Sequence, residues 1–153
     1  MDNERMDRRP ETGDGTEDGR RYKFQRLHVY QLGLDHLDMV YRLTTTFPKS
    51  ENVNLRSQLE RASTSIVLNI AEASTGQTDA EQARFLGLSL RSLMECVACL
   101  DVVERRHYAQ TEELGAIKAL GHQLFIKIQA MRHSLNKNRG KDSPSSFHGP
   151  RQP

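Results

Sequence analysis

The chain has 153 residues, of which 36% are hydrophobic and 6% aromatic, with two cysteines and no tryptophan. This length suits one domain with its own core, and the scarcity of aromatic residues favours helices over a sheet. No apolar run approaches the ~20 residues of a transmembrane helix, the N-terminus lacks the apolar segment of a secretory signal, and two cysteines make no disulfide framework, so we expect a cytoplasmic protein without a membrane partner.

The charges divide the chain into an acidic arm and a basic body. Residues 1–19 carry seven acids and three arginines, a net charge of −4, whereas residues 20–141 carry 18 lysines and arginines and 12 acids, a net charge of +6. A basic body suits a polyanionic partner, although the same count also describes an ordinary solvated surface. We predict a disordered acidic arm at residues 1–21, where there is almost nothing to bury, a folded domain at 22–138 and a disordered tail at 139–153.

The spacing of the apolar residues predicts four helices in the folded domain. The first covers residues 24–46 and stops before Pro48; the second covers residues 51–74 and stops before Gly76. The third starts with a capping box at Thr78 and runs to residue 106, and the fourth starts with Thr111 as N-cap. Short turns between such helices give an all-α, antiparallel up-down-up-down four-helix bundle. The residues predicted to face the core are Leu27, Tyr30, Leu34, Leu37, Tyr41 and Thr44 in the first helix, Leu55, Leu59, Ala62, Ile66, Ile70 and Ala73 in the second, Leu86, Leu90, Leu93, Val97 and Leu100 in the third, and Leu114, Ile117, Gly121, Leu124, Ile128, Met131 and Leu135 in the fourth.

The third helix is apolar around more of its circumference than a monomeric bundle needs. A second set of apolar residues adjoins its core face, and together they cover roughly two-thirds of the helical wheel. Burial of the excess against another subunit is the simple explanation, so we expect an oligomer. The residues assigned to the oligomer interface are Phe85, Leu88, Cys99 and Val103.

The remaining strip of the third helix carries Arg84, Arg91 and Arg105, whose positions follow a seven-residue spacing. One hypothesis is that this strip binds phosphates or an acidic partner, mostly without regard to sequence. The other is a solvated face in which Glu95 pairs with Arg91 four residues away. Little aromatic interleaving accompanies the strip, so stacking on bases is not indicated. The full set of residues assigned to nucleic-acid or partner binding is Arg84, Arg91, Arg105, Arg106, Lys118 and Arg132.

Two polar patterns have catalytic and structural interpretations, and the structural one is preferred for both. Cys96 and Cys99 form a CxxC motif in mid-helix, where neither a thiolate nor a four-ligand zinc site is supported. Asn69 and Glu72 form either an acid/base pair or a device that specifies helix packing. The sequence has no nucleotide-binding or hydrolase motif, so we predict no enzymatic activity, no metal and no cofactor.

Three stretches resemble a known family: "FQRLHVYQLGLDHLDMVYRLTTTFPKSEN", "LRSQLERASTSIVLNIAEAS" and "ARFLGLSLRSLMEC". They are similar to the four-helix-bundle family encoded in intervening sequences of bacterial 23S ribosomal RNA genes. That family includes the accessory variability determinant of diversity-generating retroelements, which binds nucleic acid, works with a reverse transcriptase and assembles as a five-fold barrel. The resemblance therefore implies a ring-shaped homopentamer with a nucleic-acid or reverse transcriptase partner, and it does not imply catalysis.

Two functions follow from these observations. The first is a non-enzymatic, oligomeric, basic scaffold that binds RNA or DNA and serves as an accessory protein to a reverse transcriptase. The alternative is a protein–protein adaptor whose arginines bind an acidic partner surface without nucleic acid.

Overall fold

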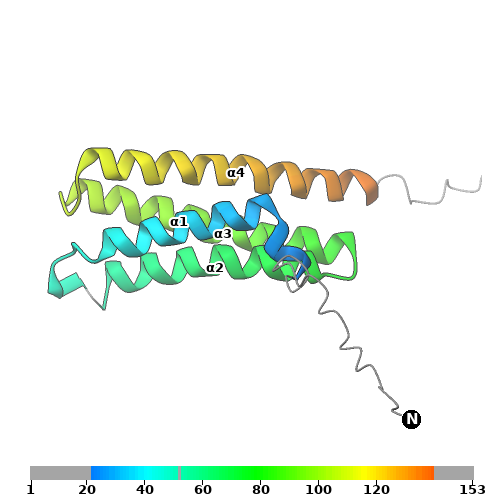
Figure 1. Cartoon of the computed structure of the whole chain (residues 1–153), viewed down its shortest axis with the longest axis horizontal. Coiled ribbons are helices and arrows are strands. Elements are labelled where there is room, and N and C mark those ends of the chain that lie inside the picture. Colours follow the sequence, from blue (N-terminus) through cyan, green and yellow to red (C-terminus); the bar gives the residue numbers. More distant parts are fainter. Residues whose placement is uncertain (1–21, 52, 140–153) are drawn as a thin grey trace, which may run out of the picture.

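The computed structural model describes residues 22–51 and 53–139, which form helices and no strand (Figure 1). A 3-10 helix, η2 (Lys23–Arg26), precedes α1 (His28–Thr44), and a second one, η3 (Lys49–Glu51), precedes α2 (Leu55–Thr75). The longer helices α3 (Asp79–Arg105) and α4 (Thr111–Arg139) follow. The all-α four-helix fold is confirmed, while the predicted arm at 1–21 and the tail at 140–153 lie outside the described residues.

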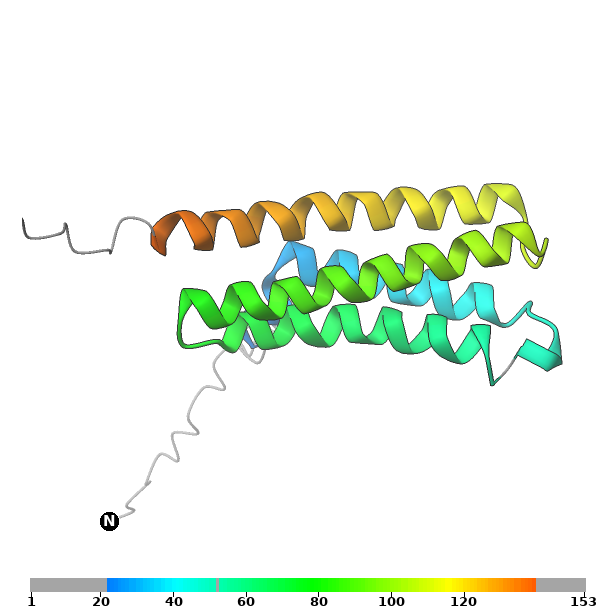
Figure 2. The same cartoon turned by 180° about the vertical axis from the view of Figure 1, so that it is seen from behind.

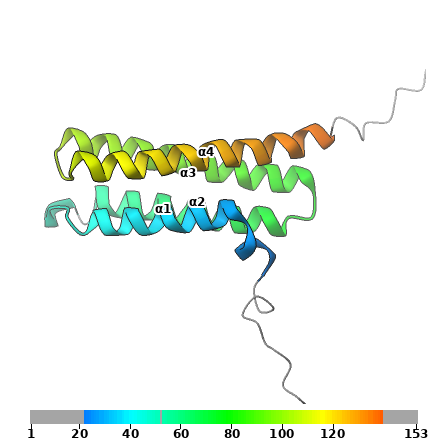
Figure 3. The same cartoon turned by 45° about the horizontal axis from the view of Figure 1, so that its top comes forward.

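The helices are arranged antiparallel in two layers. Each helix packs against the next along the chain, and α4 returns to pack against α1. Figure 3 shows α1 beside α2 in one layer and α3 beside α4 in the other. Figure 2 shows the bundle from behind relative to Figure 1, so that α3 comes to the front. The start of α1, the α2–α3 turn and the end of α4 lie at one end of the bundle (Figure 1).

The predicted boundaries of α2, α3 and α4 agree with the structure within a few residues. Thr78 caps α3, because its Oγ1 accepts a hydrogen bond of 3.2 Å from the Glu81 backbone N–H. The Glu81 carboxylate accepts in return from the backbone N–H of Gln77, at 3.0 Å, rather than from that of Thr78. One of the four N–H groups that a helix start leaves without partners, that of Glu81, is thereby satisfied, and so is the N–H of Gln77 just before the cap.

The prediction for the first helix is wrong in its start and in its buried face. Residues 23–26 form the separate η2, and Leu27 is extended, so α1 begins only at His28. Of the predicted core residues, Leu34 and Leu37 are only half-buried and Tyr41 is 44% exposed. Thr44 is buried as predicted, and Leu27 and Tyr30 pack against the core from its edge. The other residues of α1 that face the core are Val29, Gly33, His36, Val40 and Leu43.

The true core face of α1 contains a glycine and a histidine, which an apolar pattern does not select. A Cβ placed on Gly33 would lie 3.4 Å from Val67 Cγ2 and 3.5 Å from Ile70 Cδ1, so α2 packs directly over this glycine. His36 in turn contacts α4 at Gly121, where a Cβ would lie 3.5 Å from its Nε2. Close approach of the helices therefore decides which face of α1 is buried.

The apolar core runs through the interior of the four-helix bundle, and the predicted core faces of α2 and α4 line it. All six predicted core residues of α2 are buried. Of the predicted core residues of α4, only Met131 and Leu135, near the end of the helix, are partly exposed. Each large aliphatic side chain that is fully buried contributes roughly 1.5–3 kcal/mol relative to its exposed state. The largest side chains with under 2% exposure are Leu43, Leu59, Ile66, Ile70, Leu86, Leu93, Leu100, Ile117, Leu124 and Ile128.

The wide apolar arc of α3 is buried within the single chain. This helix packs against α2 and also against α4, so it needs apolar residues over two adjoining faces. Cys99 and Val103 are 6% and 0% exposed and belong to the chain's own core, so their assignment to an oligomer interface is wrong. Phe85 packs against the same core, and Leu88 is half-buried, whereas Val97, a predicted core residue, is 36% exposed.

No helix among the described residues is both long enough and apolar enough to cross a membrane.

His36 is a polar group enclosed in this core. Its side chain is 1% exposed, and its Nδ1 atom has no hydrogen-bond partner. Burial in apolar surroundings disfavours the imidazolium form, and it lowers the pKa of His36 from 6.5 to about 4. The fold therefore requires a neutral histidine at this position.

We expect His36 to make the protein less stable in weak acid. Below about pH 6.5 the unfolded chain takes up a proton at this histidine, whereas the folded chain does so only near pH 4. Its share of the free energy of unfolding is therefore complete above pH 6.5 and falls by roughly 3 kcal/mol between pH 6.5 and pH 4. Urea unfolding of wild type and His36→Leu over this range measures the difference, in which the carboxylates common to both proteins cancel. Parallel pH curves for the two proteins would contradict the prediction.

Candidate functional site

Three arginines from two helices line one open hollow on the α3–α4 layer. Arg84 and Arg91 come from α3 and Arg132 from the last third of α4, and the hollow has a volume of about 490 Å³. All three side chains are exposed. Among the described residues, no acid lines the hollow; the other lining residues are Ala80, Ala83, Gly87, Leu88 and Asn136. We call Arg84, Arg91 and Arg132 the arginine cluster.

Local packing places two of the three guanidinium groups of this cluster, those of Arg84 and Arg132. A Cβ on Gly87 would lie 3.4 Å from Arg132 Cζ and 3.5 Å from its Nε, so the Arg132 guanidinium rests on α3 where that helix has no side chain. The Arg84 guanidinium lies 5.4 Å from the centroid of the Phe85 ring, a cation–π contact worth roughly 0.5–1 kcal/mol at an exposed site. Phe85 itself packs against the core. The positive charges are thus held by the fold on both sides of the hollow.

No carboxylate of residues 22–51 and 53–139 neutralises the cluster. Among the described residues, none of the three guanidinium groups is within ion-pair distance of an acid, and the pairing of Arg91 with Glu95 that the sequence allowed is absent. Glu95 instead lines hollows on the α2 side of α3. The arginine cluster is therefore available to an external anion.

The structure separates the other predicted binding residues from the cluster. Arg105 is the last residue of α3, about 21 Å along the helix from Arg91 at 1.5 Å per residue. Arg106 lines a different hollow, together with Glu51 and Tyr108. Only Arg84, Arg91 and Arg132 of the six predicted binding residues lie together.

Lys118 is held by two acids of α3. Its Nζ donates to Glu104 Oε2 at 2.6 Å and to Asp101 Oδ1 at 2.9 Å. The hydrogen bonds to Glu104 and then to Asp101 raise the pKa of Lys118, because they favour its charged form. One lysine between two carboxylates leaves this end of the α3–α4 layer slightly negative, so Lys118 is not a free cation for an anionic ligand.

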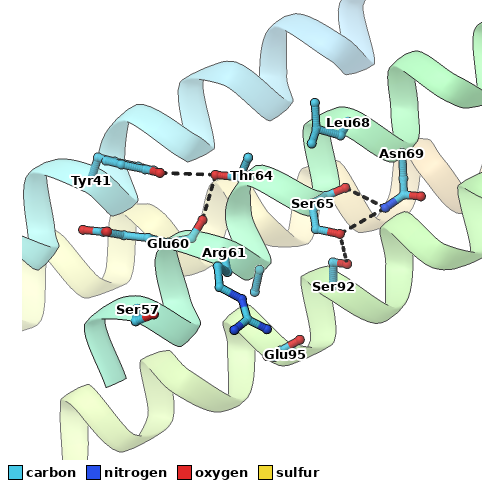
Figure 4. A pocket seen from close by; sticks show the side chains of 11 residues that line it. Tyr41, Ser57, Glu60, Arg61, Thr64, Ser65, Leu68, Asn69, Ser92 and Glu95 are labelled. Carbon is cyan, nitrogen blue, oxygen red and sulfur yellow. Dashed lines mark hydrogen bonds between the residues drawn. The ribbon is translucent and has the colours of Figure 1, made fainter. Parts of the chain in front are cut away.

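Asn69 belongs to a polar groove of about 740 Å³ between α2 and α3 (Figure 4). Its Nδ2 donates to the Ser65 carbonyl at 2.8 Å and to Ser65 Oγ at 3.1 Å, and Ser92 Oγ of α3 donates to Ser65 Oγ at 2.9 Å. Asn69 therefore takes part in a hydrogen-bonded chain that joins the two helices. Glu72 is exposed and is not part of this chain.

The CxxC residues are free thiols inside α3. Cys96 is fully buried and Cys99 is 6% exposed, and burial raises the pKa of both thiols. A raised pKa keeps them protonated and unreactive. Within residues 22–51 and 53–139, no three side chains of His, Cys, Asp or Glu are grouped as metal ligands would be.

The sequence interpretation named all three arginines of the cluster, but it did not predict that they line one hollow without the other three predicted binding residues. Arg132 was known only as one of several basic residues of the fourth helix, and nothing in the sequence aligned it with Arg84 and Arg91. The one available signal was Gly87, which lies three residues after Arg84 and four before Arg91, on the same helical face. A glycine in the interior of a helix costs about 1 kcal/mol relative to alanine, so it often marks a close approach.

Comparisons with known proteins agree with the fold and with the sequence motifs. No curated protein matches the chain in sequence. One similar solved structure is a protein of unknown function from the S23 ribosomal protein family of Bacteroides thetaiotaomicron VPI-5482; it has 21% sequence identity and a TM-score of 0.64, over 69% of this chain and 95% of that chain. At this identity the likeness concerns the fold alone. The model of the 23S rRNA-intervening sequence protein family matches residues 25–130, more than half of the chain. The chain therefore belongs to the 23S rRNA-intervening sequence protein family.

Proposed function

We propose that this protein binds nucleic acid through its phosphates, without catalysis, and that the arginine cluster is the main contact. The observation that carries the proposal is the convergence of Arg84, Arg91 and Arg132 on one hollow that has no acidic lining residue. Guanidinium groups bind phosphate oxygens in a bidentate fork and keep their charge at every physiological pH. Three of them held together favour a phosphate over the solvated-face interpretation, in which each charge is independent.

We also propose that the protein acts as a homo-oligomer, a pentamer by the sequence resemblance, so that the cluster is repeated. Support comes from large apolar side chains on the surface of the single chain: Leu68, Ile126 and Val102 are 60%, 53% and 46% exposed. Repeated clusters bind one polyanion with an effective concentration that single clusters lack.

The reverse transcriptase partner implied by the resemblance is part of the same proposal, and co-purification of the two proteins tests it.

Reversing the charges of the cluster should weaken binding to all nucleic acids alike. We expect Arg84→Glu/Arg91→Glu/Arg132→Glu to lower the affinity for RNA and DNA by at least about tenfold at low salt. Each lost phosphate contact removes about 0.7–0.9 from the slope of log affinity against log salt, so the slope should fall by about 2 to 3. A fluorescence anisotropy titration over a range of salt concentrations measures both quantities.

The matched control is Arg61→Glu/Arg105→Glu/Arg106→Glu, which changes the net charge equally at three exposed arginines outside the cluster. It should keep most of the affinity and the salt slope. Equal losses in both triple variants would mean that only net charge matters. The adaptor function is correct instead if wild type binds an acidic protein partner but no nucleic acid, and if the cluster variant no longer binds that partner.

Deleting residues 1–19 should tighten nucleic-acid binding several-fold. This segment carries a net charge of −4, and it joins the bundle at Tyr22, at the end where the cluster lies. Removing it lowers the repulsion of phosphates near the cluster, so the effect should be largest at low salt. A full-length variant with the seven acids changed to Asn or Gln should behave like the deletion. Unchanged affinity in both would show that the arm does not affect this site.

The oligomer is tested by light scattering on the purified protein. We expect a mass several times that of the chain, and Leu68→Glu should lower it while leaving helicity unchanged, because Leu68 is exposed on the single chain. Glu72→Gln, an exposed position one turn further along α2, serves as the control. A monomer at micromolar concentration would overturn this part of the proposal.

A further inference from the structure

A second hollow on the α3–α4 layer is almost entirely apolar. Its volume is about 370 Å³, within the range of small-ligand sites. Met94 and Val97 of α3 form part of its wall, although they are 46% and 36% exposed. The other lining residues are Leu100 of α3, Ile117, Lys118, Gly121, His122 and Phe125 of α4, and His36 of α1.

Gly121 provides space in this hollow. A Cβ at this position would have its nearest neighbour, His36 Nε2, at 3.5 Å, which is an ordinary contact. A larger side chain at position 121 is therefore sterically possible at its Cβ, yet the chain has none there. Beyond Gly121, His36 of α1 also lines the hollow, with its Nε2 atom toward Gly121 and its side chain 1% exposed.

The apolar hollow and the arginine cluster share one face of the α3–α4 layer. On α4, the residues of the two sites recur at helical spacing: 118, 122 and 125 in the apolar hollow, then 132 and 136 in the other. On α3, Arg91 ends one site and Met94 begins the next, three residues later. Arg91 and Val97 are about 9 Å apart along the helix axis, which suits a phosphate and a base of the same or neighbouring nucleotides.

Charge fixes the direction of a ligand along this face. The arginine cluster lies at one end of the apolar hollow, and the group formed by Lys118, Asp101 and Glu104, with two acids and one lysine, lies at the other. An anionic group is attracted to the first end and repelled by the second. A ligand with an uncharged flat part and a phosphate matches this order.

We infer that the apolar hollow receives an unpaired nucleobase of a single strand whose phosphates bind the arginine cluster. The inference rests on the proposed function and adds a preference for single-stranded over double-stranded nucleic acid, because a base inside a duplex does not reach the hollow. Phe125 offers an aromatic face, and Met94 and Val97 offer apolar contacts to either side of a base. The exposed imidazole of His122 supplies a polar group for the base edge.

The experiment compares a short single-stranded oligonucleotide with an abasic strand of the same length, which has the same phosphates and no bases. Wild type should bind the strand with bases about tenfold more tightly, as one stacked base contributes roughly 1–3 kcal/mol. Gly121→Leu fills the hollow, so it should bind both strands with the abasic affinity. Gly115→Leu is the matched control on the same helix, because a Cβ there meets nothing within 4 Å, and it should keep the preference.

A second variant covers the case in which Gly121→Leu does not fold. Met94→Ser/Val97→Ser changes two exposed positions and should reduce the preference for bases while leaving the affinity for the abasic strand and the salt slope unchanged. Equal binding of both strands by wild type would overturn the inference and leave the phosphate proposal intact. Binding of neither strand would overturn both. A Gly121→Leu protein that keeps the base preference and loses oligomer mass would show that the hollow is a contact between subunits.

Discussion

Packing of α3 against two neighbours is the constraint on which the rest of the molecule depends. Burial against both α2 and α4 takes up the broad apolar surface of this helix, including Leu86, Leu93 and Val103. Arg84 and Arg91 remain on the solvent side near the start of α3, whereas Met94, Val97 and Val102 are exposed further along the helix. The hydrophobic effect that orients α3 thereby also fixes the position of two of the three charges in the candidate site.

Glycines set the depth of the α3–α4 groove. At Gly87 the absence of a side chain lets the Arg132 guanidinium lie against α3, and at Gly121 it leaves space in front of His36. Side chains at these two positions would lie within the sites on the α3–α4 layer. The cost is helix propensity, about 1 kcal/mol for each glycine in a helix interior. A Cβ at Gly121 would make only ordinary contacts with His36 and Leu93, so core packing alone does not exclude alanine at this position.

Much of the fold was predictable, because α2, α3 and α4 have long apolar repeats and clear start and stop residues. The family resemblance, drawn from motifs between residues 24 and 96, is confirmed by the match over residues 25–130. The face of α1 was not predictable, since Gly33 and His36 are buried by the approach of α2 and α4 rather than by their own hydrophobicity. The same limit explains Cys99 and Val103: one helical wheel does not say whether its excess apolar arc meets a second helix of the chain or another subunit.

The candidate site was predictable only in part, for a related reason. The strip with seven-residue spacing identified Arg84 and Arg91. It also included Arg105, which lies about 21 Å along the helix from Arg91 and therefore outside the cluster. The grouping of Arg84 and Arg91 with Arg132, and the position of Phe125 in the adjoining apolar hollow, depend on how α4 aligns beside α3. The spacing of residues within one helix does not predict this alignment between two helices. The strip of α3 gives no sign of an aromatic residue near the cluster, whereas in the bundle Phe125 of the neighbouring helix lines the adjoining hollow.

The two halves of the α3–α4 face differ in physical character, and this difference bears on what such a site discriminates. Contacts between arginines and phosphates release counterions, so their contribution shrinks as salt rises and is nearly the same for any polyanion. A base in the apolar hollow is bound by burial and stacking, which salt weakens little. At low salt the cluster therefore dominates and hides any preference for unpaired bases. The proposal therefore assigns a larger share of the affinity to the apolar hollow at physiological salt, and it predicts that a groove with both parts distinguishes a single strand from a duplex where a basic strip alone does not.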